Sequence, residues 1–107
     1  MAEYVFKGDW ENTNDFRLDS DGTALDLSSV TQIDANIAGV DIVSTNQADD
    51  LIRWSQVGFV TGEIRCQFGS APGLMPGAWP CYFIVYDPVN VDGIVFGPMT
   101  LTVVQLP

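Results

Sequence analysis

The 107-residue sequence contains no histidine, and only 4 of its residues are lysine or arginine, against 14 that are aspartate or glutamate. Histidine is the commonest general base and metal ligand, so its absence removes the Ser-His and Cys-His nucleophile pairs. No phosphate-binding or dinucleotide-binding glycine motif is present either. We therefore expect no enzymatic activity and no cofactor.

The shortage of basic residues also limits the choice of partners. The net charge is −10, and the four basic residues, Lys7, Arg17, Arg53 and Arg65, do not cluster in the sequence. Such a surface repels phosphate backbones, so we expect no direct nucleic-acid binding. No apolar run is long enough to span a membrane, and residues 1–4 lack the features of a signal peptide. The sequence predicts synthesis in the cytoplasm and no membrane contact.

Potential ligands for a metal are also few. The two cysteines, Cys66 and Cys81, do not have the CxxC spacing of a zinc site, and cytoplasmic thiols are normally reduced. We favour two small core residues, and a Cys66–Cys81 disulfide is the alternative. Asp19 and Asp21, beside Gly22, could bind calcium, but the acids do not have the spacing of an EF-hand loop. We favour a solvated turn and expect no metal site.

The sequence does contain the alternation of apolar and polar residues, and the turn signals, that are typical of β-strands. Its 10 glycines and 6 prolines divide the chain into short segments. Ile33, Ala35 and Ile37 alternate with polar residues, as in a half-buried strand. Asp21-Gly22 is a strong signal for a hairpin turn. These features predict a single all-β domain over residues 1–107, an antiparallel sandwich of about 7–9 short strands.

One strand pairing can be predicted in register. If residues 62–68 and 79–86 form a hairpin centred on residues 73 and 74, then Cys66 faces Cys81. Facing side chains point to the same side of a sheet. The core side of this hairpin would carry Ile64, Cys66, Phe68, Cys81, Phe83 and Val85.

The aromatic residues offer candidate contacts with a partner. For Trp54 we favour a place in the core. The uncharged loop of residues 69–79 carries Leu74, Met75 and Trp79, and an exposed apolar loop usually has a partner. A docking role for these three residues and a loop folded back onto the core remain equal alternatives.

Further contact candidates lie near the ends of the chain. Trp10, Phe6 and Tyr4 are the aromatic residues of the first segment. The terminal strands, residues 1–6 and 101–107, are candidates for pairing with a neighbouring protein by strand addition.

The order of several segments is similar to that of a known family. These are FKGDW at residues 6–10, DGTALDLS at 21–28, LMPGAWPCY at 74–82, the turn at 87–93 and GPMTLTVV at 97–104. Together they resemble the immunoglobulin-like domains of tailed-phage structural proteins, in particular the N-terminal domain of baseplate upper proteins. The resemblance covers nearly the whole chain.

This resemblance implies an immunoglobulin-like fold and a non-enzymatic structural role in the virion of a bacteriophage. The protein would serve as a capsid decoration, neck or tail/baseplate adaptor. It would be made in the host cytoplasm and would bind other virion proteins in multiple symmetric copies. Because baseplate proteins continue into a receptor-binding region, a free-standing accessory protein is favoured. The alternative function is a carbohydrate-binding or adhesion module, which the aromatic content and the predicted sandwich support.

Overall fold

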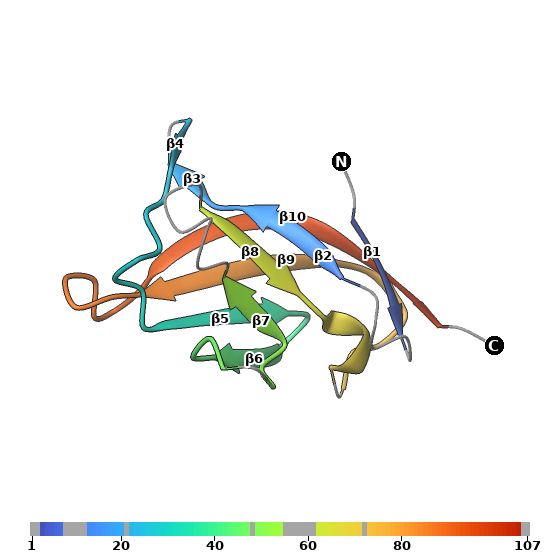
Figure 1. Ribbon diagram of the computed structural model, residues 1–107. Helices are drawn as coiled ribbons and strands as arrows, with labels where there is room; N and C mark the ends of the chain where they lie inside the picture. Colours follow the sequence, from blue (N-terminus) through green and yellow to red (C-terminus); the bar gives the residue numbers. More distant parts are fainter. Residues whose placement is uncertain are drawn as a thin grey trace.

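The computed structural model describes residues 3–7, 13–20, 22–47, 49–54, 62–71 and 73–105. These residues form ten strands and one short 3-10 helix (Figure 1). The elements are β1 (Glu3–Lys7), β2 (Asn14–Arg17), β3 (Asp19–Ser20), β4 (Thr23–Ala24), β5 (Gln32–Ile37), β6 (Val40–Ser44), β7 (Ile52–Trp54), β8 (Glu63–Cys66), η2 (Phe68–Ser70), β9 (Gly77–Tyr86) and β10 (Ile94–Gln105). Within these ranges, no helix has the length and apolar character needed to cross a bilayer. The all-β prediction is confirmed.

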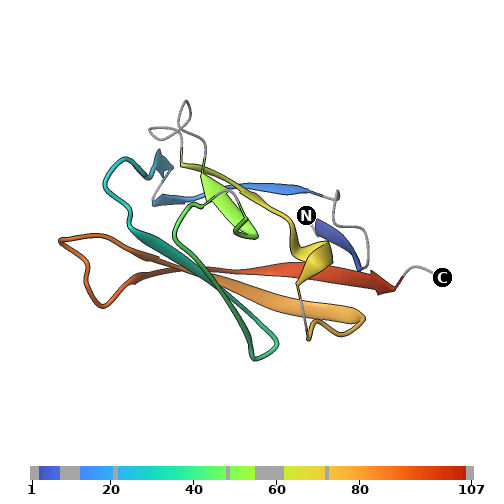
Figure 2. The same cartoon turned by 60° about the horizontal axis from the view of Figure 1, so that its bottom comes forward.

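The strands form two main sheets that pack as layers, seen edge-on in Figure 2. One sheet has the order β1-β10-β9-β5-β6 and the other the order β2-β8-β7, while β3 and β4 form a small hairpin. In immunoglobulin domains, strands B, E and D form one sheet and strands C, F and G the other, with C′ beside C in variable-type domains. Strands β2, β8 and β7 occupy the B, E and D positions, and β6, β5, β9 and β10 the C′, C, F and G positions. The order of the strands is therefore immunoglobulin-like, and among the described strands β1 and β10 pair in parallel, unlike the antiparallel pairing that the sequence predicted.

The alternating sequence patterns produce the buried faces of these strands. Ile33, Ala35 and Ile37 of β5 are buried, while the polar residues between them are half-buried. The predicted turn at Gly22 is also confirmed, because Gly22 has φ +83° and lies between the paired strands β3 and β4. Such a backbone conformation is easily adopted only by glycine.

Aromatic side chains join the two layers. Phe83 of β9 is fully buried, and its ring centroid lies 5.3 Å from that of Phe16 of β2, in the opposite sheet. The Phe68 ring of η2 stacks beside Phe83 at 6.4 Å. Trp54 of β7 is buried as predicted. The core therefore lies between the sheets.

The predicted hairpin between residues 62–68 and 79–86 is wrong. Strand β8 pairs with β2 and β7, whereas β9 pairs with β10 and β5, so Cys66 and Cys81 belong to opposite sheets. The chain crosses from one layer to the other through η2 and the turn after it, instead of folding back in one sheet. The predicted core side is nevertheless confirmed, because alternation fixes which side chains are buried whichever strands pair. The buried residues include Ile64, Cys66, Phe68, Cys81, Phe83 and Val85.

Candidate functional site

The structure divides the apolar loop that the sequence offered as a docking site. Leu74 is only 1% exposed and packs in the core, so a docking role for Leu74 is wrong. The half-buried Trp79 folds over its own loop, and its Nε1–H donates a hydrogen bond of 2.8 Å to the carbonyl oxygen of Met75. Met75 itself is exposed. Of the three candidates, Met75 alone has a mostly exposed side chain.

The terminal candidates are only partly described. Tyr4 is exposed on β1, and Phe6 lies on the same strand, with a side chain outside the described parts. Trp10 also lies outside the described residues. Strands β1 and β10 pair with each other in parallel, with Glu3 opposite Leu101 and Lys7 opposite Gln105. Residues 101–103 of β10 therefore have β1 on one side and β9 on the other, so strand addition along this part of the last strand is wrong.

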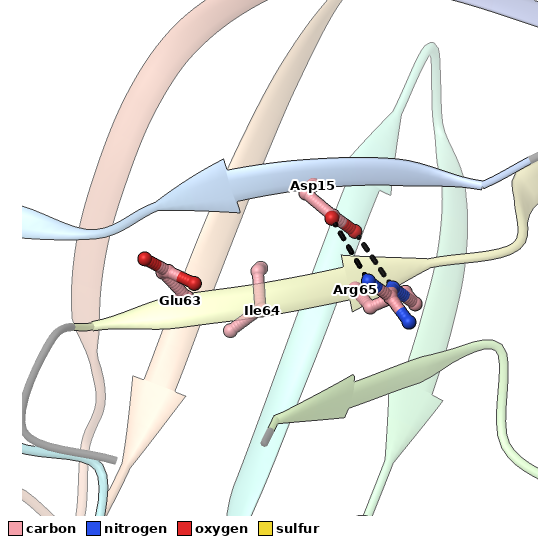
Figure 3. Close-up of a pocket in the computed structure, with 4 residues that line it drawn as sticks. All are labelled: Asp15, Glu63, Ile64 and Arg65. Atoms are coloured by element: carbon pink, nitrogen blue, oxygen red, sulfur yellow. Dashed lines mark hydrogen bonds and ion pairs between the residues drawn. The ribbon is translucent and has the colours of Figure 1, made fainter. Parts of the chain in front are cut away.

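The outward side of the sheet β2-β8-β7, which we call the three-stranded face, carries charged residues of both signs. Its described charged residues are Asp15, Arg17, Arg53, Glu63 and Arg65. The Arg65 Nε lies 3.0 Å from Asp15 Oδ1 and its Nη2 lies 3.2 Å from Oδ2. Figure 3 shows these two contacts as dashed lines. The hydrogen bonds and charge of Asp15 raise the pKa of Arg65. The hollow beside this pair holds only about 50 Å³.

The other two arginines of this face also have polar neighbours. The Arg17 Nε lies 3.8 Å from the Asp19 Oδ2. The Arg53 guanidinium donates a hydrogen bond of 2.6 Å to the Gln67 Oε1. Both members of the Arg65–Asp15 pair are more than half exposed. Exposed pairs of this kind contribute little to stability, and they suit a face in contact with water.

The outward side of the sheet β1-β10-β9-β5-β6, which we call the five-stranded face, is different. The strand registers place Val95 beside Ile84, Ile84 beside Asp34 and Asp34 beside Val43, in one row across four strands. Val95 is 62% exposed and Val43 is 56% exposed. Large aliphatic side chains thus face solvent on both sides of a carboxylate.

The neighbouring row of this face is aromatic and polar. It contains Tyr82, Asn36 and Asp41, and the Asn36 Nδ2 donates a hydrogen bond of 2.7 Å to Asp41 Oδ1. Asp34 in turn accepts a hydrogen bond of 2.8 Å from Gln32 Nε2. Among the described side chains of this face, no lysine or arginine accompanies the two carboxylates.

The hairpin between β9 and β10 extends the five-stranded face past the end of the sandwich, at the left of Figure 1. Val89 is 88% exposed at its tip, and Val91 is exposed as well. The Asp87 carboxylate orders the turn by accepting hydrogen bonds from the N–H groups of Val89 and Asn90. These bonds lower the pKa of Asp87, with Asn90 the main contributor.

The base of this hairpin packs against the sheet through a glycine. Gly93 has φ +89°, and a Cβ at this position would lie 2.6 Å from Ile84 Cγ2 and 2.9 Å from Tyr86 Cε1. The Ile84 side chain and the Tyr86 ring thus occupy the space in which a side chain at position 93 would stand. Partial desolvation, followed by the charge and hydrogen bond of Asp34, raises the pKa of Tyr86.

An open depression of about 510 Å³ lies beside this hairpin. Its lining residues are Thr31, Gln32, Tyr86, Asp87, Pro88 and Val91. The sequence interpretation treated residues 87–93 only as a turn and overlooked this region. Three valines close together in the sequence, at positions 89, 91 and 95, were the available signal.

The remaining reactive groups are placed as follows. Cys66 and Cys81 are free, buried thiols, and burial raises the pKa of both, that of Cys81 to about 12. Asp19 of the suggested calcium pair is exposed on β3, and Asp21 lies outside the described residues. In the described ranges, no group of three or more histidine, cysteine, aspartate or glutamate side chains could hold a metal ion.

No match was found among protein-family models, among curated proteins or among solved structures.

Proposed function

We propose that the protein is a non-enzymatic structural protein of a tailed-phage virion. In this proposal it binds other virion proteins as a capsid decoration, neck or tail/baseplate adaptor. The phage assignment rests on the resemblance of the ordered segments from FKGDW at residues 6–10 to GPMTLTVV at residues 97–104.

The observation that carries a binding role is the contrast between the two faces of the sandwich. The three-stranded face has ion pairs and no described large apolar residue that is exposed. The five-stranded face and its hairpin carry exposed Val43, Val89, Val91 and Val95. Monomeric proteins rarely expose extended apolar patches, and such patches usually mark interaction sites. The asymmetry supports a subunit that attaches by one face and leaves the other in water.

Mass spectrometry of purified particles of the encoding phage tests the proposal. We expect the chain to be a virion component in multiple copies. Particles that lack the chain are then mixed with purified full chain, either wild type, Val95→Asp or the matched control Thr13→Asp. Thr13 is exposed next to β2, so the control adds the same charge at the other sheet.

Wild type and Thr13→Asp should bind the particles equally well. Val95→Asp should bind at least about tenfold more weakly, because burial of one valine contributes about 1.5 kcal/mol or more. Absence of the chain from the particles would refute the virion role. Equal binding by all three proteins would refute the assignment of the binding face.

The depression beside Tyr86 favours one second candidate, a carbohydrate-binding module. A half-exposed aromatic ring with amide, hydroxyl and carboxylate neighbours is a common arrangement for sugar binding. A glycan array would show hits that Tyr86→Ala abolishes and Glu63→Gln retains. A blank array with the wild-type chain would dismiss this candidate.

A further inference from the structure

The charges of the two faces differ as much as their apolar content does. The three described arginine side chains, Arg17, Arg53 and Arg65, all lie on the three-stranded face. The five-stranded face has the carboxylates of Asp34 and Asp41. In the described part of this face, the groups that form hydrogen bonds with these two carboxylates are side-chain amides and the Tyr86 hydroxyl, all of which are neutral.

We propose that the five-stranded face docks on a different protein whose contact surface has an apolar centre and lysine or arginine at the positions that meet Asp34 and Asp41. This inference rests on the proposed binding function and adds the partner's chemistry. The contact would centre on Val43, Ile84 and Val95, which lie in one row with Asp34.

The position of Asp34 is the reason for the basic partner. Asp34 is half-buried and lies between Ile84 and Val43, so a partner that covers these apolar side chains also covers the carboxylate. Removing a carboxylate from water is costly unless a cation replaces the lost hydration. If an apolar partner had no lysine or arginine at this position, the desolvation of the Asp34 carboxylate would cost more free energy than the burial of Val43 would contribute.

A second copy of the chain does not supply that cation. Two copies joined by their five-stranded faces would bring Asp34 and Asp41 of both copies together, and like charges across an interface oppose binding. The three-stranded face of a second copy offers arginines, but each is already held by a neighbour on its own side of the molecule: Arg65 is paired with Asp15, Arg17 lies beside Asp19, and Arg53 donates a hydrogen bond to Gln67 Oε1. The net charge of −10 adds a general repulsion between copies. The occupant is therefore a protein of opposite charge.

A random library of 12-residue peptides, selected on the immobilised full chain, tests this chemistry without a known partner. We expect enriched peptides that combine lysine or arginine with large apolar residues. Their affinity for the chain should fall about tenfold on Asp34→Asn, which removes one charge-assisted contact. The affinity should also fall with rising salt concentration.

Two variants complete the comparison. Glu63→Gln removes an equal charge from the three-stranded face and should leave peptide affinity within about twofold. Val95→Asp should abolish binding while thermal unfolding stays close to that of the wild-type chain, because Val95 is mostly exposed.

The inference is overturned if no peptide is enriched, if the enriched peptides are neutral or acidic, or if Asp34→Asn and Glu63→Gln weaken binding equally. A homodimer in sedimentation that Val95→Asp dissociates would overturn it in favour of a second copy. If basic peptides bind as expected but the chain is absent from virions, the virion role alone fails. If the chain is in virions but the peptides do not depend on Asp34, the partner's chemistry alone fails.

Discussion

Replacement of Phe83 by alanine tests the arrangement of the two layers. Phe83 is fully buried, and its ring contacts Phe16 of the opposite sheet and Phe68 of η2, at centroid distances of 5.3 and 6.4 Å. Truncation of a buried phenylalanine costs about 3–5 kcal/mol, and each lost aromatic pair adds about 0.5–1.5 kcal/mol beyond its buried area. Domains of this size have a free energy of unfolding of about 5–15 kcal/mol, so Phe83→Ala should remove most of the stability.

The matched control is the adjacent residue of β9. Tyr82 points to the outer side of the same sheet and is partly exposed, so Tyr82→Ala should cost less than about 1 kcal/mol. Urea unfolding followed by tryptophan fluorescence measures both variants, with an unchanged m-value as the test of comparable unfolding.

A shift of one residue in the register of β9 would exchange the faces of Phe83 and Tyr82. Equal losses for the two variants, or a larger loss for Tyr82→Ala, would therefore refute the register and the position of the core. Loss of cooperative unfolding in Phe83→Ala alone would agree with the central position of this ring.

Three further predictions concern backbone, thiols and acid. Gly93→Ala should lower the free energy of unfolding by about 2–4 kcal/mol and Gly39→Ala by about 1 kcal/mol, because both have positive φ but only Gly93 is crowded; equal losses in chemical denaturation would contradict the close packing at Gly93. Cys66 and Cys81 should react with Ellman's reagent at pH 8 only after unfolding, since both thiols are buried with raised pKa values; rapid labelling of the native chain would count against their burial. The pKa of Asp50 is lowered by hydrogen bonds from two backbone N–H groups of its loop, so the stability that it contributes is present above about pH 4 and is lost as the pH falls through its folded pKa; melting temperatures of Asp50→Asn should fall less steeply than those of the wild type below pH 4, and parallel curves would argue against this role.

Local patterns in the sequence predicted much of the burial. The alternation of Ile33, Ala35 and Ile37 specifies one buried face, because successive side chains of a strand point to opposite sides. The same reasoning placed Cys66 and Cys81 in the core although their predicted strand partners were wrong. Burial depends on the period of two within a strand, and it is insensitive to which strand lies alongside.

The pairing of strands and the fate of the loop of residues 69–79 could not be obtained in this way. Leu74 and Met75 are adjacent and both apolar, yet Leu74 is buried and Met75 is exposed. Their positions depend on the crossing of the chain between the sheets through η2. The pairing of β5 with β9 joins segments that are about fifty residues apart, and no local pattern encodes that choice.

The candidate binding face likewise depends partly on properties that the sequence predicts and partly on the tertiary structure. The sequence by itself determined that the chain is an all-β domain with a strong negative charge and no histidine, since composition and short-range alternation carry that information. Only the tertiary structure decided that Val43 and Val95 lie in one row with Asp34, while the described arginines lie on the opposite face. The physical reason is that a surface is assembled from strands distant in the chain, and the order of strands in each sheet is fixed by long-range pairing and core packing.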